Sequence, residues 1–148
     1  MNEAHFHLLV NHLPVILPLV ACIMLIVGLI VMSTTIKRTA YVIFIVEAVS
    51  TSLAMYSGDK AEKVIEKIDV NAKTYIEKHE EAAETFALTN YVSGVIALIA
   101  LIASYKESRY LHLLSIAVLL ISLITLYFSK QTGTTGGEIR HTEIRLNN

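Results

Sequence analysis

The sequence predicts an all-α membrane protein in which four transmembrane helices form a bundle. Hydrophobic residues make up 54% of the 148 residues, charged residues make up 17%, and the mean hydropathy is +0.57. Soluble domains are about half apolar and a quarter charged. Four apolar runs, at 13–33, 40–56, 85–105 and 110–129, each approach the roughly 20 residues that a helix needs to cross a bilayer. The length suits one domain, so residues 1–148 are expected to form a single four-helix membrane domain.

The first apolar run contains two prolines and no charged residue. Pro14 and Pro18 each lack a backbone donor, so a helix start or a kink is expected there. The preceding residues are polar, contain Glu3 and lack the basic region of a secretory signal. The run is therefore expected to remain as a span. Cys22 is the single cysteine, which excludes a disulfide within the chain.

The outer segment 57–84 separates the second run from the third. Ala61, Val64, Ile65 and Ile68 recur at the spacing of one helix face, which predicts an extra-membrane amphipathic helix. A break is expected at Val70 and Asn71. From there one continuous helix of about 33 residues is expected to run into the third span.

The outer tail 130–148 follows the fourth run. Three glycines in it, at positions 133, 136 and 137, are expected to end the helix. The next residues alternate between apolar and polar, which predicts a short strand or a segment lying against the membrane face.

The distribution of charge predicts the orientation. The loops that contain Lys37, Arg38, Lys106 and Arg109 lie on one side and are net positive, whereas the 57–84 segment is net acidic. Positive loops stay inside, so both termini are expected on the outer, periplasmic side of a bacterial inner membrane. The lipid bilayer is the first expected partner. The net charge of −1 gives no basic field that would bind nucleic acid.

Five of the six histidines fall at this outer face and come from three segments; they are His5, His7, His12, His79 and His141. Imidazoles beside hydrocarbon are typical ligands of a haem or a metal ion. His5 and His12 are seven residues apart and share a helix face, whereas His7 points roughly opposite to His12. Arg140 lies beside His141 and, with Arg145 and Lys130, could pair with an anionic group such as a haem propionate.

Haem b is the first cofactor hypothesis, with His7, His12, His79, His141 and Arg140 as the candidate binding residues. Bis-imidazole ligation requires two neutral histidines on opposing helices, and a four-span bundle supplies such positions. No CxxCH motif is present, which excludes covalent c-type attachment. Electron transfer is the expected use.

A non-haem zinc, copper or iron ion held by His5, His7, His12, His79 and His141 is the alternative. A third hypothesis is a structural subunit of a larger membrane complex, in which the histidines have no such role.

Glu47 is an acidic residue within the second apolar run. An acid there is costly and normally faces the bundle interior or water. It could be neutral and bonded to the neighbouring Ser50 and Thr51, which the sequence favours, or it could hold a proton as part of a relay.

Four motifs resemble a bacterial four-span membrane family of unknown function. They are HLLVNHLP at 7–14, SGDKAE at 57–62, HEEAAE at 79–84 and TGTTGGEIRHTEIR at 132–145. The resemblance implies that His7, His12, His79 and His141 are the family's shared histidines. Some of its members are fused to Rieske iron–sulfur domains, which implies electron transfer with a redox partner or a Rieske-type protein. The arrangement also resembles small four-helix b-type cytochromes. A homo-oligomer is compatible with this pattern.

Overall fold

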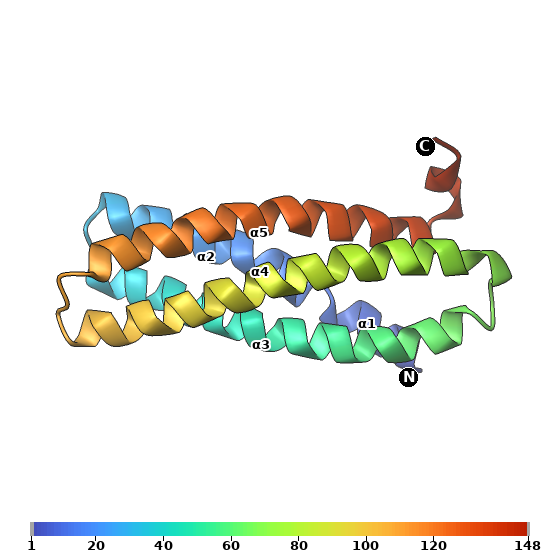
Figure 1. Cartoon of the computed structure of the whole chain (residues 1–148), viewed down its shortest axis with the longest axis horizontal. Coiled ribbons are helices and arrows are strands. Elements are labelled where there is room, and N and C mark those ends of the chain that lie inside the picture. The colour runs from blue at the N-terminus through green and yellow to red at the C-terminus, as the bar shows by residue number, and fades with distance from the viewer. Residues whose placement is uncertain (1, 148) are drawn as a thin grey trace.

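The computed structural model describes residues 2–147, apart from the side chains of residues 70, 146 and 147. In this part of the chain the elements are α1 (Glu3–Val10), α2 (Leu13–Ile30), α3 (Thr34–Ile65), η1 (Val70–Ala72), α4 (Lys73–Tyr105), α5 (Leu111–Arg140) and η2 (Thr142–Asn147). The long helices lie side by side in an elongated bundle with both termini at the same end (Figure 1). The predicted all-α four-helix fold is confirmed.

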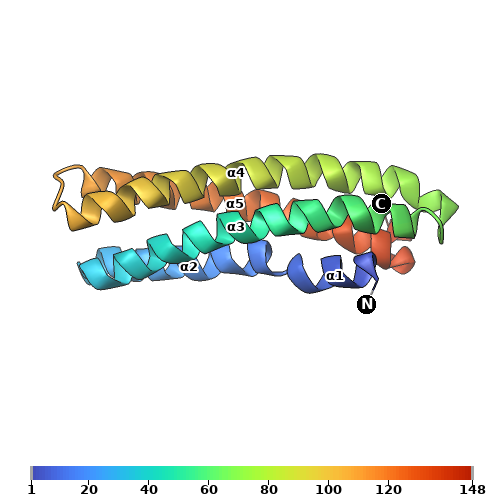
Figure 2. The ribbon, with the colours of Figure 1, turned by 90° about the horizontal axis from the view of Figure 1, so that it is seen from below.

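The helices are arranged so that each contacts its neighbours around the bundle. α3 packs on α2 and α4, α4 packs on α5, and α5 returns to α2. α1 continues the line of α2 beyond the turn at residues 11–12 and packs on α3 (Figure 2). At the end of the bundle that carries both termini, called the outer end from here on, α1 and α4 therefore occupy diagonal positions with α3 between them.

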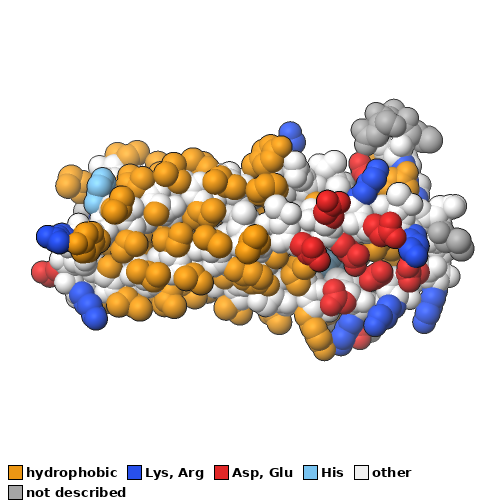
Figure 3. All heavy atoms as spheres, viewed as in Figure 1, with side chains coloured by type: hydrophobic (Ala, Val, Ile, Leu, Met, Phe, Trp, Pro, Cys, Tyr) orange, Lys and Arg blue, Asp and Glu red, His pale blue; other side chains and the backbone are white. Residues whose placement is uncertain are grey.

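The surface separates an apolar band from a charged end. Four helices of the described chain are long and apolar enough to cross a membrane. Apolar side chains cover most of the face in Figure 3, and acidic and basic side chains gather over the end that carries the termini. Charged side chains avoid hydrocarbon. The apolar band therefore coincides with the predicted membrane spans. The charged end of the bundle, which contains residues 57–84 and the N-terminal helix α1, extends beyond them.

Small residues bring the helices together in the half of the bundle farther from the termini. The core there contains Leu25, Tyr41, Phe44 and Val118 with several alanines. Gly94 faces Ala48, where an added Cβ would lie 2.6 Å from the Ala48 Cβ. Such contacts are favoured in membranes because lipid gives little hydrophobic drive for association, so close van der Waals packing supplies it.

Two similar turns close the end of the bundle opposite the termini. Met32 and Glu107 adopt the left-handed conformation, with φ of 55° and 48°. In each turn the next residue donates its N–H back across the helix end, from Ser33 to the Gly28 carbonyl and from Ser108 to the Ala103 carbonyl. This is the Schellman pattern, which satisfies carbonyls that the helix leaves without partners. The two turns thus end α2 and α4 and reverse the chain.

The outer segment differs from the expectation of a separate amphipathic helix. α3 runs without interruption to Ile65, so the amphipathic stretch is its last part. Ile68 was expected on the buried face but is 79% exposed, because the helix has ended and the chain turns before it. The expected break at residues 70–71 is confirmed as η1. The continuous helix that follows is confirmed as the 33 residues of α4.

The expectation that the glycines end the last helix is wrong. α5 continues through positions 133, 136 and 137 to Arg140, and η2 replaces the expected strand. Packing against α4 compensates for the low helix propensity of glycine. The Thr132 hydroxyl donates to the Ala82 carbonyl at 3.0 Å, and Gly136 lies against the His79 ring.

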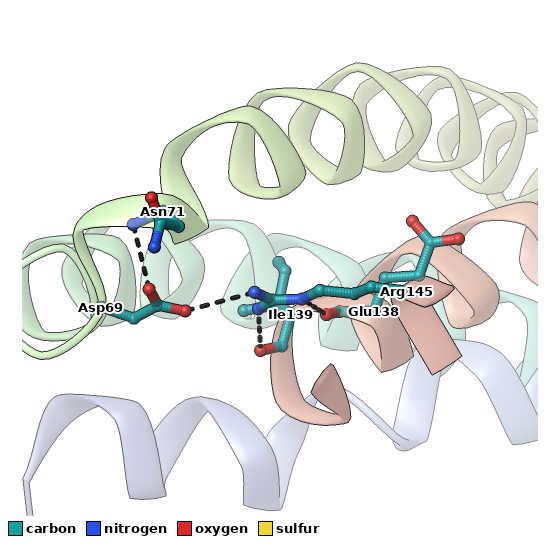
Figure 4. Close-up of polar contacts among 5 residues, drawn as sticks. All are labelled: Asp69, Asn71, Glu138, Ile139 and Arg145. Carbon is teal, nitrogen blue, oxygen red and sulfur yellow. Dashed lines mark hydrogen bonds and ion pairs between the residues drawn. The ribbon is translucent and has the colours of Figure 1, made fainter. Parts of the chain in front are cut away.

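Arg145 fastens the end of the chain to the α3–α4 connection (Figure 4). Its guanidinium donates to the Glu138 and Ile139 carbonyls at 2.7 and 2.9 Å, and so caps α5. It also pairs with Asp69 at 3.3 Å and lies 4.2 Å from the centre of the Tyr75 ring. Asp69 in turn accepts a hydrogen bond from the Asn71 N–H. Arg145 is therefore engaged in the fold.

Two glycine-to-alanine changes should have opposite effects on stability. Gly94→Ala should destabilise the bundle by about 1–3 kcal/mol because α3 and α4 must separate to admit the Cβ. At Gly133 an added Cβ meets nothing within 4 Å. There the same change should stabilise the bundle by about 0.5–1 kcal/mol through helix propensity. Thermal unfolding in detergent measures both, and equal effects would contradict the packing described for Gly94.

Candidate functional site: a histidine pair at the outer end of the bundle

His7 lies on α1 with its ring turned toward α3. Its Nδ1 is 2.9 Å from the Ser57 hydroxyl oxygen, and the side chain is partly buried. Burial lowers the pKa of His7, and the nearby Ala54 carbonyl opposes this shift. The neutral imidazole is therefore favoured at position 7.

His79 lies on α4 and makes the corresponding contact with α5. Its Nδ1 is 3.0 Å from the Thr135 hydroxyl oxygen. Burial lowers the pKa of His79, the positive charge that His7 would carry lowers it further, and the Thr132 carbonyl opposes both. His7 and His79, on the diagonal helices α1 and α4, therefore lie within electrostatic range, so that a charge on one ring repels a charge on the other.

The hydroxyl partners determine which ring nitrogen of each histidine carries the proton. The Ser57 hydroxyl donates to the Ala54 carbonyl at 2.9 Å. The Thr135 hydroxyl donates to the carbonyls of Thr132 and Gln131 at 3.1 and 3.2 Å. A hydroxyl has one proton to donate, so an oxygen whose proton is engaged by a carbonyl accepts from the imidazole. Both neutral rings therefore carry the proton on Nδ1, and the Nε2 lone pair remains available as a ligand.

A glycine follows each hydroxyl partner and lies beside the histidine ring. A Cβ on Gly136 would lie 3.0 Å from the His79 Cε1, and one on Gly58 would lie 3.5 Å from the His7 Cε1. A side chain at Gly136 would thus press on the ring. The two halves of the site repeat one arrangement, in which a histidine packs on the Ser-Gly or Thr-Gly pair of the next helix.

The other predicted histidines lie elsewhere. His5 is exposed on α1. His12 is exposed at the start of α2, with its Nδ1 2.9 Å from the Leu8 carbonyl. His141 ends α5 with a 59% exposed side chain, and its Nδ1 is 2.9 Å from a Glu143 carboxylate oxygen. Arg140 is exposed one residue earlier. None of these residues takes part in the contacts that hold the His7–His79 pair.

The described residues contain no group of three or more histidine, cysteine or acidic side chains placed to hold a metal ion. The pair therefore offers two imidazole ligands without a third ligand of this kind. Histidine is one of the residues that serve as axial ligands of haem iron, so two imidazoles are compatible with the haem hypothesis, which stays a prediction.

An acidic surface lies next to His79. Burial raises the pKa of Glu80, and Glu62, Asp59 and Glu84 raise it further through their negative charges. Four carboxylates from α3 and α4 thus influence one another at the outer end. Figure 3 shows acidic side chains gathered at the end of the bundle that carries the termini. The surface beside the histidine pair is therefore negative and attracts cationic groups.

No family model, curated protein or solved structure matches this chain.

The sequence argument did not identify the hydroxyl and glycine residues that hold the rings. Ser57, Gly58, Thr135 and Gly136 fall in two of the motifs quoted for the resemblance, but none was predicted to hold a histidine, and Gly136 was expected to end the helix. The sequence feature that could have identified these residues is the repeated hydroxyl–glycine pair, at 57–58 and at 135–136. This feature predicts a contact with a histidine only when it is known which helices pack together.

The histidine pair should make stability depend on pH. Because the folded pKa values lie below the usual 6.5, the unfolded chain binds more protons between these values, so stability rises with pH in that range. The stability that the two neutral histidines contribute should be complete above about pH 6.5. This contribution should be lost as the pH falls toward and through the lowered pKa values. Unfolding temperature measured against pH checks this expectation.

The matched variants are a His7→Gln/His79→Gln double variant and His112→Gln, which alters an exposed ring at the opposite end. The double variant should show a shallower pH dependence than the unmodified chain, whereas His112→Gln should retain the full dependence. An unchanged slope in the double variant would contradict the burial described for the pair.

Proposed function

We propose that this protein binds one haem b through the Nε2 atoms of His7 and His79 and serves in electron transfer. The observation that carries the proposal is the matched pair of partly buried imidazoles on diagonal helices. Each holds its Nδ1 proton on a hydroxyl and leaves Nε2 free. Metal-ligating histidines commonly donate their second ring nitrogen in this way, which fixes ring orientation.

A haem is favoured over a non-haem zinc, copper or iron ion by the number of ligands. Haem iron takes four nitrogens from its own macrocycle and needs two axial ligands from the protein. Zinc sites usually require three or four protein ligands. The described residues supply two imidazoles without a third histidine, cysteine or acidic ligand. The ion remains the second candidate because the acidic surface of Glu62 and Glu80 lies nearby.

A bound haem supplies one-electron exchange at its iron, and the chain supplies position and electrostatics. Ser57 and Thr135 hold the rings in the ligand tautomer, and Gly58 and Gly136 leave space beside them. α1 packs on α3 and is joined to α2 by the turn at 11–12. An outward movement of α1 is the route by which we expect a planar cofactor to enter.

Lys130 is a candidate partner for a haem propionate. It lines a shallow open cleft that Thr135 also lines, so a cation lies on the same surface as the residue that holds His79. Arg140 is exposed and available, whereas Arg145 is already paired with Asp69. Of the three cations suggested by the sequence, Lys130 and Arg140 therefore remain for this role.

We place the protein in the inner membrane of a bacterium with the site and both termini on the periplasmic side. The positive loops at the opposite end support this orientation. The negative surface beside His79 favours a redox partner with a basic contact surface, and a Rieske-type protein is one candidate. The proposed relationship to the four-span family through His7, His12, His79 and His141 leads to the same kind of partner. A homo-oligomer is compatible with it.

Absorption spectra of the detergent-purified protein test the ligand assignment. Protein made with haem supplied should show a Soret band and a sharp reduced α-band. His7→Ala and His79→Ala should each lose the six-coordinate spectrum because one axial ligand is gone. The exposed His5→Ala, His12→Ala and His141→Ala variants should retain it.

Two other outcomes would redirect the assignment. Stoichiometric zinc, copper or iron without a Soret band would favour the non-haem site. Neither signal, in protein supplied with haem and metals, would favour a structural subunit of a larger complex.

The hydroxyl partners should matter for affinity. Ser57→Ala and Thr135→Val each remove the acceptor that orients a ring, so haem affinity should fall about 10–100-fold while the ligands stay in place. Haem titration followed at the Soret band measures this change. Thr134→Val is the control, because that hydroxyl is exposed and donates to the Lys130 carbonyl. Equal effects of Thr134→Val and Thr135→Val would contradict the proposed role of Thr135.

A further inference from the structure

Glu47 is completely buried within the second span. Its side chain is 0% exposed, and neither carboxyl oxygen has a hydrogen-bond partner among the described residues. The sequence-based preference that Ser50 and Thr51 would bond this carboxyl is therefore wrong. Both hydroxyls instead donate to the backbone carbonyl of Glu47, at 2.8 and 2.9 Å.

The neighbouring helix adds another acceptor without a partner. Asn90 on α4 is also 0% exposed, and its Nδ2 donates to the Thr51 hydroxyl at 3.0 Å. Its Oδ1 has no partner in the described structure. The Ser93 hydroxyl donates to the Asn90 carbonyl. The Ser50, Thr51 and Ser93 hydroxyls have thus each used their one proton, and oxygen lone pairs remain.

The helices packed around Glu47 provide no cation to balance a negative charge. α2 contains no charged residue, and its titratable group is Cys22. The third span contains Tyr91 and Tyr105, and the second span, within α3, contains Tyr41 and Tyr56. The titratable residues of the fourth span are Tyr110, His112 and Tyr127. Lys and Arg are absent from all four spans at this depth. An ionised carboxylate without a partner is strongly disfavoured in such surroundings.

We propose that Glu47 is a proton-binding site in the membrane core and that its proton exchanges with water at the outer end of the bundle. A hydronium ion at the outer end gives up one proton and leaves water. Each hydroxyl group on the way accepts one proton and passes on its own, so one carboxylate oxygen of Glu47 gains a proton and no electron moves. The neutral acid also gains an O–H donor, which is the type of group that this acceptor-rich region lacks.

A line of buried hydroxyl groups leads from Glu47 toward the outer end. On α3 it comprises Ser50, Thr51 and Ser57. On α5 it comprises four buried residues that share one face of that helix: Ser122, Thr125, Ser129 and Thr132. We call these seven residues the hydroxyl seam. In the other direction lie the apolar core of Ala40, Phe44, Leu25 and Val118 and a smaller set of buried hydroxyls at Tyr41, Ser104 and Ser115, so the longer line of hydroxyls leads outward.

The hydroxyl seam ends at the histidine pair. Ser57 is itself the partner of His7, and Thr135, one turn beyond Thr132, is the partner of His79. Glu47 and Ser57 are separated by ten residues of α3, or about 15 Å along the helix. The proton site does not depend on haem binding, because it follows from the surroundings of Glu47 alone.

Labelling with dicyclohexylcarbodiimide tests whether Glu47 carries a proton. This apolar reagent adds to protonated carboxylic acids in hydrophobic surroundings and gives a stable acylurea. Mass spectrometry of the digested wild-type protein should find the label on the Glu47 peptide, with labelling lost as the pH is raised. Glu47→Gln should lose the label, whereas Glu80→Gln, at the exposed acidic surface, should retain it.

Two results of this experiment would overturn the proposal. The first is an unlabelled Glu47 peptide in the wild-type protein at every pH, which requires no variant to interpret. The second is protection by sodium chloride, relative to choline chloride at the same pH, because a metal cation would then occupy the carboxylate instead of a proton. Both readouts are made on haem-free protein, so failure of the proposed haem site leaves them interpretable.

Infrared spectroscopy tests the exchange route. The carbonyl band of the protonated carboxylic acid should shift when the medium is changed to D2O, and the band should be absent in Glu47→Gln. A Thr125→Val/Ser129→Ala variant should slow the shift because it interrupts the hydroxyl seam. Ser115→Ala, which alters the hydroxyl bonded to Tyr41 in the other half of the bundle, should leave the rate unchanged. Equal rates in both variants would exclude this route.

Discussion

Hydroxyl side chains that donate to carbonyls of their own helix determine the character of this bundle's interior. Ser57, Ser93, Ser122 and Thr125 all make this bond. The bond satisfies the only proton of the hydroxyl without a partner on another helix, so small polar residues can pack where the helices approach closely. It also leaves acceptor oxygens facing the core. The two unusual features of the molecule follow from this arrangement.

The first consequence is the defined chemistry of the histidine pair. When Ser57 and Thr135 donate to their helix carbonyls, they accept from His7 and His79, so each ring holds its proton on Nδ1 and presents Nε2. Burial keeps both rings neutral, which is the form that binds a metal. The site is therefore assembled from helix–hydroxyl–imidazole contacts, and the glycines at 58 and 136 set how closely each ring approaches the next helix.

The second consequence is the isolation of Glu47. In a soluble core a buried carboxyl usually finds a donor, but the hydroxyls around Glu47 have already donated to the backbone. The carboxyl and the Asn90 oxygen share a region that contains acceptors and lacks a cation. The same face of α3 that carries Glu47 in the membrane carries Ser57 at the outer end. One helix thus connects the proton site with the histidine site.

Several features could be predicted from the order of residues alone: the number of spans, the break at residues 70–71, the long helix after it, and the presence of histidines at one end. Those features depend on local hydropathy and periodicity, which the order of residues contains. Which histidines lie near one another follows only from the tertiary structure. His7 and His79 are 72 positions apart, and they approach each other because α1 and α4 both pack on α3. The continuation of α5 through its glycines and the capping of that helix by Arg145 likewise follow from the tertiary structure. In both cases contacts with a distant segment outweigh local propensity.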